Sequence, residues 1–375
     1  MFTRRITICR LFGIAIHIDM SWLLIAGLVI WSFAVNYFPQ EIRGLPASVY
    51  LLMGFGVAAG LLFSIIFHEM SHCIVAKQQG IAIQGITLFL FGGVAEMEEE
   101  PPSPKSEFLM TIAGPLASLL LAAVFWLIAR LFQTPGWGLI VSKVFGYLMM
   151  MNFGLAIFNM IPAFPLDGGR ILRSLLWGWK GSLRWATGIA TSLGSGFGII
   201  LIVAGMLLVV NQQWGGIWWV LIGMFVRYAA QMSYQQMLVR RGLEGEPVRR
   251  FMRENPVTVG PSVNLREFVE NYVYRHHFKM FPVLENGRLT GCATTSRLKE
   301  IPIEQWNGKT VSDILQPCSQ ENTIDPGADA MKALTRMNRN RASRLMVVEN
   351  GQLKGILSLK DLLDFLSLKI ELEEE

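Results

Sequence analysis

Three titratable residues lie on one helical turn of an otherwise apolar stretch, SIIFHEMSHCIVA (64–76). His68 and His72 are four positions apart, so on a helix they share one face with about 6 Å between them. This spacing lets two imidazoles bind one zinc ion, while Glu69 is placed to accept a proton from water at the metal. Charged groups are costly in hydrocarbon and usually pair, bind an ion or do chemistry. The pattern predicts a catalytic zinc site; a hydrogen-bonded structural pair of histidines is the alternative.

Catalytic zinc needs a third protein ligand, and FNMIPAFPLDGGR (158–170) offers one. Pro162 and Pro165 would end or kink the preceding helix. Broken backbone at membrane depth is tolerated only where it is buried in protein or lines a cavity. In isolation the segment reads as an ordinary turn. Together with HEMSH, it predicts that Asp167 turns inward and completes a site with His68 and His72.

The elements that carry these residues are predicted to cross a membrane. Hydrophobic residues make up 52% of the 375-residue chain and charged residues only 16%, against about 25% charged in a soluble domain. The apolar residues are concentrated in the first 235 positions, in runs long enough to span a bilayer at about 20 residues each. The sequence predicts a polytopic α-helical membrane domain with six spans, at about 14–35, 49–72, 108–129, 144–163, 187–210 and 214–234.

Basic residues predict the orientation of these spans, because cytoplasmic loops are enriched in Lys and Arg. One side of the membrane would hold fourteen basic residues and the other side only Arg43, Arg130 and Lys143. Both termini are therefore expected in the cytoplasm, with the protein in the cell membrane. The net charge of +5 follows from this topology, so no nucleic-acid partner is needed to explain it.

The composition changes after Met237, where LVRRGLEGEPVRRFMREN (238–255) reads as a charged linker. An internal repeat follows, because FPVLENGRLTGCATTSRLKEI (281–301) aligns with LMVVENGQLKGILSLKDLLDF (345–365). In each copy an Asn-Gly pair joins two apolar strands, which is a strong hairpin signal. A helix follows each hairpin and an amphipathic helix precedes it, near 264–276 and 327–338.

This repeated unit resembles a pair of CBS domains, which are soluble α/β modules. The predicted boundaries are a transmembrane domain at 1–237, a linker at 238–248, CBS domains at 249–305 and 306–368, and an acidic tail at 369–375. CBS pairs commonly associate, so the resemblance also implies a homodimer formed through these domains.

HEMSH and N-x-x-P-x-x-P-L-D-G-G (159–169) together resemble the site-2 protease family of intramembrane zinc metalloproteases. The resemblance implies one Zn²⁺ per chain held by His68, His72 and Asp167. It also implies that Glu69 is the general base and that Asn159 aids substrate binding. The implied substrate is a single-span regulatory membrane protein, such as an anti-sigma factor, that is cut within the lipid bilayer.

Two further stretches resemble the same family. ITLFLFGGVAEM (86–97) is similar to its membrane re-entrant β-hairpin, and AGPLAS (113–118) to its third-helix signature. Gly92 and Gly93 would let an unwound substrate approach and pair as an added strand; an ordinary interfacial loop is the alternative. About ten residues separate the hairpin from the next span, so the closest resemblance is to compact members with a C-terminal CBS pair.

Some CBS domains bind adenine nucleotides through a Ser or Thr followed three positions later by Asp. The second copy has both residues, as Ser358 and Asp361, whereas the first has Thr294 but Arg297 at the position of the aspartate. Nearby basic residues could neutralise a triphosphate: Arg339, Arg341 and Arg344. We expect one adenine nucleotide, such as ATP, per pair; a purely structural dimerisation module is the alternative.

Two other functions compete with proteolysis. The first is a CBS-gated metal transporter or channel, in which His68, His72 and Asp167 form a transit site. The second is a catalytically inactive scaffold stabilised by zinc. The transporter hypothesis leaves Glu69 and the proline-broken Asp167 segment unexplained, and the sequence has no inverted hydropathy repeat to support it.

Overall fold

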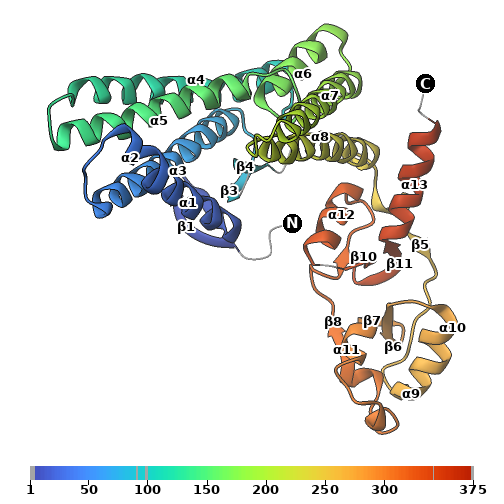
Figure 1. The fold of residues 1–375 in the computed structure, drawn as a ribbon. Coiled ribbons are helices and arrows are strands. Elements are labelled where there is room, and N and C mark those ends of the chain that lie inside the picture. Colours follow the sequence, from blue (N-terminus) through green and yellow to red (C-terminus); the bar gives the residue numbers. More distant parts are fainter. Residues whose placement is uncertain (1–4, 90–91, 98–99, 341, 373–375) are drawn as a thin grey trace. The chain divides into compact units, whose positions relative to one another are not determined.

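The computed structural model describes residues 5–89, 92–97, 100–340 and 342–372. The chain divides into two compact units, with the boundary between Tyr234 and Gln235 (Figure 1). The first unit contains the HEMSH and PLDGG segments, and the second contains the sequence repeat.

The first unit consists of helices and one small sheet. Its strands are β1 (Arg5–Leu11), β2 (Ile14–Asp19), β3 (Ile83–Phe89) and β4 (Gly92–Met97). Its helices are α1 (Met20–Ser32), η1 (Phe33–Tyr37), α2 (Phe38–Glu41), α3 (Ala47–Gln78), α4 (Pro104–Leu131), α5 (Trp137–Asn159), α6 (Asp167–Lys180), α7 (Leu183–Val210) and α8 (Gly216–Leu243).

Within the described residues, five helical segments are long and apolar enough to cross a membrane. They are Met20–Glu41, Ala47–Gln78, Pro104–Leu131, Trp137–Asn159 and Leu183–Val210. The sixth predicted span, 214–234, coincides with most of α8, which is not among the five. Arginine and glutamine residues interrupt that helix and lower its mean hydropathy.

The first predicted span, 14–35, begins wrongly, because Ile14–Asp19 is the strand β2 and the helix starts at Met20. A short apolar run does not distinguish a strand from a buried helix. Here β2 is an inner strand of a four-stranded sheet ordered β1-β2-β3-β4. It pairs antiparallel with β1 and parallel with β3. Asp19 then caps α1, accepting a hydrogen bond from the Ser21 N–H at 2.9 Å.

The predicted hairpin at 86–97 is present as β3 and β4, which pair antiparallel from Ile83↔Met97 to Phe89↔Gly92. Residues 90 and 91, at its tip, lie outside the described residues. Because β4 is at the end of the sheet order, its outer edge pairs with no strand in the described part of the chain.

Helices α3 and α5 run parallel in close contact. Gly56 faces Val144, Gly60 faces Leu148, and the Asn152 amide donates to the Ser64 hydroxyl at 2.9 Å. A Cβ at Gly60 would lie 2.4 Å from a Leu148 methyl, so glycine permits this close approach. Each pair has the same offset of 88 residues. One turn further on, this register places Ala156 at the level of His68.

The second unit contains two β-sheets, ordered β5-β11-β10-β9 and β6-β7-β8. The Asn-Gly turns are as predicted: Asn286 and Gly287 have φ of 50° and 78°, and Asn350 and Gly351 have 50° and 77°. Positive φ at both central residues is what a type I′ turn requires. The two turns join β6 to β7 and β10 to β11 as antiparallel pairs.

The strands of the second unit are β5 (Arg253–Glu254), β6 (Met280–Glu285), β7 (Arg288–Thr294), β8 (Leu315–Pro317), β9 (Thr323–Ile324), β10 (Arg344–Glu349) and β11 (Gln352–Ser358). Its helical segments are η2 (Val248–Arg250), α9 (Leu265–Glu267), η3 (Phe268–Val273), α10 (Tyr274–His276), α11 (Thr295–Leu298), η4 (Ile303–Gln305), η5 (Val311–Ile314), α12 (Ala330–Arg339) and α13 (Leu359–Leu372). The helices predicted near 264–276 and 327–338 correspond to α9–η3–α10 and to α12.

Candidate metal centre

Three side chains predicted as metal ligands meet at one point, although they come from two helices. Asp167 Oδ2 lies 3.1 Å from His68 Nε2 and 3.4 Å from His72 Nε2. The two Nε2 atoms are 3.2 Å apart. All three residues are buried, with 4%, 6% and 9% exposure for His68, His72 and Asp167. These separations would let the three atoms bind a single small ion.

Helix α4 orients both histidines. The His72 Nδ1–H donates to the Met110 carbonyl at 2.8 Å, and His68 Nδ1 is hydrogen-bonded to the Ser118 hydroxyl at 2.9 Å. A partner on Nδ1 fixes the ring orientation and leaves Nε2 to face the third ligand. The resemblance of AGPLAS (113–118) to a family signature predicts no role for Ser118.

Gly114 provides the space in which the two Nε2 atoms meet. A Cβ at this position would lie 2.2 Å from His72 Nε2 and 2.7 Å from His68 Nε2. Any larger residue would therefore displace the rings. The sequence pattern likewise predicts no role for Gly114, although its four-residue spacing from Ser118 places both residues on one face of a helix.

Asp167 is the first residue of α6 and follows the broken segment after α5. Gly168 and Gly169 let α6 start close to this segment, because their Cβ atoms would lie 2.3 Å from Met160 O and from Phe164 N. Bulkier residues there would push Asp167 away from the histidines.

Glu69 lies beside His68 on α3 and is half-buried. Strand β4 passes directly against it, since a Cβ at Gly93 would lie 2.5 Å from Glu69 Cγ. Gly92 differs: its φ is 133°, and a Cβ there would meet no atom within 4 Å. The two glycines predicted to contact substrate therefore lack a side chain for different structural reasons. Gly93 closely approaches Glu69, and Gly92 has a backbone conformation that favours glycine.

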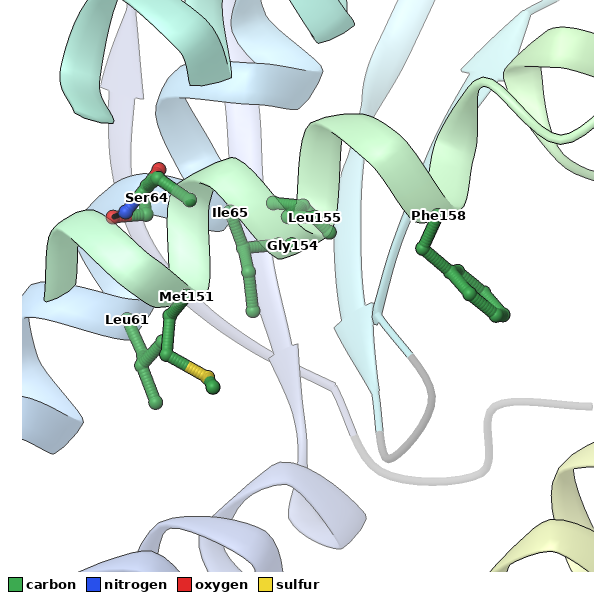
Figure 2. Close-up of a pocket in the computed structure, with 8 residues that line it drawn as sticks. Leu61, Ser64, Ile65, Met151, Gly154, Leu155 and Phe158 are labelled. Atoms are coloured by element: carbon green, nitrogen blue, oxygen red, sulfur yellow. Dashed lines mark hydrogen bonds between the residues drawn. The ribbon is translucent and has the colours of Figure 1, made fainter. Parts of the chain in front are cut away.

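Asn159 is the last residue of α5 and is half-buried. Earlier residues of this helix line a cavity of about 300 Å³ against α3 (Figure 2). The cavity is formed by Leu61, Ser64, Ile65, Met151, Asn152, Gly154, Leu155 and Phe158. On α3, Ser64 and Ile65 precede His68 and Glu69 by one helical turn. The cavity therefore adjoins the candidate catalytic residues and is mostly apolar.

The donor set fits zinc. Two imidazole nitrogens and one carboxylate oxygen are ligands that zinc accepts, and three protein ligands leave one coordination position open, as in catalytic sites. The missing side chain at Gly114 and the hydrogen-bonded Nδ1 atoms are consistent with Nε2 coordination by both histidines.

In the second unit, the candidate nucleotide residues of the two copies differ. The Ser358 hydroxyl donates to Asp361 Oδ2, and Arg253 Nη2 lies 2.8 Å from Asp361 Oδ1. Thr294 caps α11, accepting from the Arg297 N–H at 3.4 Å. In the second copy the carboxylate thus already binds a guanidinium, which a ribose would have to displace.

The basic residues near these sites are also placed differently. Arg297 pairs with Glu300 at 3.3 Å. The Arg344 guanidinium lies over the Phe278 ring, 4.5 Å from its centroid. Arg341 is outside the described residues. Burial lowers the pKa of Arg344, while the nearby Asp361 carboxylate raises it and the nearby Arg253 guanidinium lowers it.

Two protein-family models match this chain, one in the first unit and one in the second. The model of peptidase family M50 matches residues 56–142 and 130–203, and the CBS-domain model matches 248–303 and 311–368. The Synechocystis sp. protein "Putative zinc metalloprotease sll0528" is 33% identical over 358 residues, covering 94% of this chain and 93% of that protein. "Zinc metalloprotease MJ0392" of Methanocaldococcus jannaschii is 32% identical over 319 residues, covering 84% of this chain and 86% of that protein.

A solved structure, the site-2 protease from Methanocaldococcus jannaschii, is also similar. It is 30% identical, covers 61% of this chain and 94% of its own, and has a TM-score of 0.43. The sequence similarity to the Synechocystis protein extends over nearly the whole of both chains, so the resemblance seen in the motifs is confirmed. This multi-pass membrane chain belongs to peptidase family M50, the site-2 protease family of zinc metalloproteases, and carries a pair of CBS domains.

Proposed function

We propose that this zinc metalloprotease cuts single-span regulatory membrane proteins within their transmembrane segments. One observation carries the proposal: the cluster of His68, His72 and Asp167 is buried, and both histidines belong to a 32-residue apolar helix, α3. A metal site on such a helix supports chemistry on a substrate that reaches it through the bilayer. An anti-sigma factor or the membrane-bound form of a transcription factor is a substrate of this kind.

Each residue of the site has a separate proposed role. His68, His72 and Asp167 would hold zinc, which when bound supplies Lewis-acid activation of water and of a peptide carbonyl. Glu69 would take a proton from the attacking water and pass it to the leaving amine. Asn159 would hydrogen-bond the substrate backbone or the developing oxyanion.

The free edge of β4 is the proposed binding surface for the cleaved segment. A transmembrane helix hides its peptide carbonyls in its own hydrogen bonds, so it must unwind before cleavage. An extended segment could pair with β4 as an added strand, its main-chain groups bonding to the open edge. Because β4 passes directly against Glu69 at Gly93, a segment paired with β4 would lie near this residue. This arrangement supports a re-entrant hairpin over an ordinary interfacial loop.

The cavity between α3 and α5 is the proposed subsite for an apolar substrate side chain. It lies one helical turn before His68 and Glu69 on α3, and Phe158 in its wall adjoins Asn159 on α5. Gly154 leaves open space in this wall, since a Cβ there would meet no atom within 4 Å. Ligand sites of this kind are mostly apolar with a few polar groups, here Ser64 and Asn152.

For the topology, we propose six spans in the cell membrane with both termini in the cytoplasm. Helix α8 has 28 residues, or about 42 Å at 1.5 Å per residue, which exceeds the roughly 30 Å of a bilayer core. Its last turn contains Arg240 and Arg241, as expected of a cytoplasmic end.

For the CBS pair, we propose that it binds one adenine nucleotide such as ATP, forms a homodimer, and modulates the protease. Ser358 and Asp361 would hold the ribose and Thr294 a phosphate. Arg253, which pairs with Asp361, and Arg344, whose charge is influenced by both, would meet the phosphates.

The test is co-expression with a panel of single-span reporter proteins, comparing wild type with Glu69→Gln. Wild type should cleave at least one reporter within its transmembrane segment, whereas Glu69→Gln should keep its zinc and cleave none. Equal cleavage by both proteins would refute the proposed role of Glu69. Zinc flux into vesicles without any cleavage would favour the transporter hypothesis instead.

A further inference from the structure

A buried ion pair joins α4 to α6 near the candidate metal centre. Glu107, in the first turn of α4, is fully buried, and Arg173 of α6 is only 6% exposed. The Arg173 Nε–H donates to Glu107 Oε1 at 2.8 Å, and its Nη2 contacts the same oxygen. Arg170 Nε lies 3.8 Å from that oxygen as well. Glu107 Oε2 is buried and has no hydrogen-bond partner in the described part of the chain.

Such a pair is a costly way to join two helices. Removing two charges from water carries a large penalty, and well-packed apolar residues often replace a buried ion pair with no loss of stability. The unpartnered Oε2 adds to the cost, because a buried acceptor without a donor keeps its full desolvation penalty. The directional geometry of the pair, rather than its contribution to stability, is the feature to be explained.

Arg173 connects the segment before Asp167 with the part of α6 that follows it. It lies six residues after Asp167 on the same helix, or about 9 Å along the axis. Its guanidinium also lies over the ring of Phe164, 5.3 Å from the centroid, in the segment that leads into Asp167. A shift of Arg173 would therefore move both the start of α6 and the residues before it.

Helix α4 thus contacts the surroundings of all three candidate ligands. It reaches the histidines directly, through the Met110 carbonyl and the Ser118 hydroxyl. It reaches α6, which carries Asp167, through Glu107 and Arg173. Met110 and Glu107 are three residues apart, so the two contacts lie on the same face of α4.

We propose that Glu107 and Arg173 are positioning residues for the metal site: their ion pair sets α6 on α4 so that Asp167 meets both imidazoles. The proposal rests on the zinc ligand set proposed above. Metal–ligand distances are specified to about 0.2 Å, so a small rotation or slide of α6 moves the carboxylate out of range. An apolar contact between α4 and α6 has no comparable direction and would allow such movement.

The test uses the purified full-length protein, with zinc affinity measured by chelator competition and site geometry by the absorption spectrum of the cobalt(II) form. The variants are Glu107→Gln, Arg173→Lys and Arg173→Met. We expect zinc affinity to fall 10- to 100-fold, as for other groups that orient metal ligands, together with a changed cobalt spectrum. Arg173→Lys, which keeps the charge, should lose less than Arg173→Met.

The matched control is Ser142→Ala. The Ser142 hydroxyl donates to the Ala129 carbonyl at 2.7 Å and ties α5 to α4 near the other end of α4. Its removal should lower thermal stability but leave zinc affinity and the cobalt spectrum unchanged.

Unchanged zinc affinity and an unchanged cobalt spectrum in Glu107→Gln and Arg173→Lys would overturn the proposal and leave the pair a structural contact. Should Arg173→Met fail to fold, these two milder variants decide the matter alone. A wild-type protein that binds no zinc would instead refute the ligand set, which distinguishes the failure of the proposed site from the failure of the positioning pair.

Discussion

Replacing Gly114 with alanine is a sharp test of the metal centre, because the added methyl group would enter the space in which the two imidazoles meet. The helix itself should tolerate the change, since Gly→Ala in a helix interior gains about 1 kcal/mol, which offsets part of an overpacking cost of about 1–3 kcal/mol. The new Cβ would, however, lie 2.2 Å from His72 Nε2 and 2.7 Å from His68 Nε2. Carbon and nitrogen do not approach so closely, so the rings must move by about 1 Å, several times the 0.2 Å tolerance of a metal–ligand distance.

We therefore expect Gly114→Ala to weaken zinc binding at least 100-fold, beyond the effect of losing one orienting group. Zinc content after purification and chelator competition measure this directly, and a thermal melt of the metal-free protein measures the effect on folding. Gly146→Ala is the matched control, since a Cβ at Gly146 in α5 meets no atom within 4 Å; it should leave zinc affinity unchanged. Wild-type zinc affinity in Gly114→Ala would refute Nε2 coordination by the two histidines.

Three further predictions concern the substrate and the nucleotide. Gly93→Val should slow cleavage of a reporter while zinc stays bound, because its Cβ would lie 2.5 Å from Glu69 Cγ and such overpacking costs about 1–3 kcal/mol; unchanged turnover would exclude a close passage of β4. Gly154→Leu should fill part of the 300 Å³ cavity and reduce cleavage of reporters with large apolar side chains, whereas Gly146→Leu on the same helix should not. Asp361→Ala should weaken ATP binding to the full-length protein roughly 10- to 100-fold in calorimetry, as expected when a hydrogen bond to a charged group is lost; no binding of ATP, ADP or AMP by wild type would leave the CBS pair a dimerisation module.

The sequence alone predicted the features that depend on residues only a few positions apart. The four-residue interval between His68 and His72 places both on one helical face whatever surrounds the helix. The Asn-Gly turns at 286–287 and 350–351 are similarly local, since few other residue pairs accept positive φ at both positions. Proline and glycine around Asp167 likewise predicted that the helix ends before this residue, as it does at Asn159.

Contacts between distant segments were decided only by the tertiary structure. The short apolar run 14–19 is compatible with either helix or strand, and only its hydrogen bonds to β1 and β3 make it a strand. Gly114 and Ser118 look like ordinary small residues of an apolar helix until α4 packs against the two histidines. Whether Glu107 and Arg173 pair depends on the angle at which α4 and α6 cross. The spacing of residues along the sequence does not predict this angle. Sequence spacing specifies neighbours within one element, whereas the site is assembled by packing between elements.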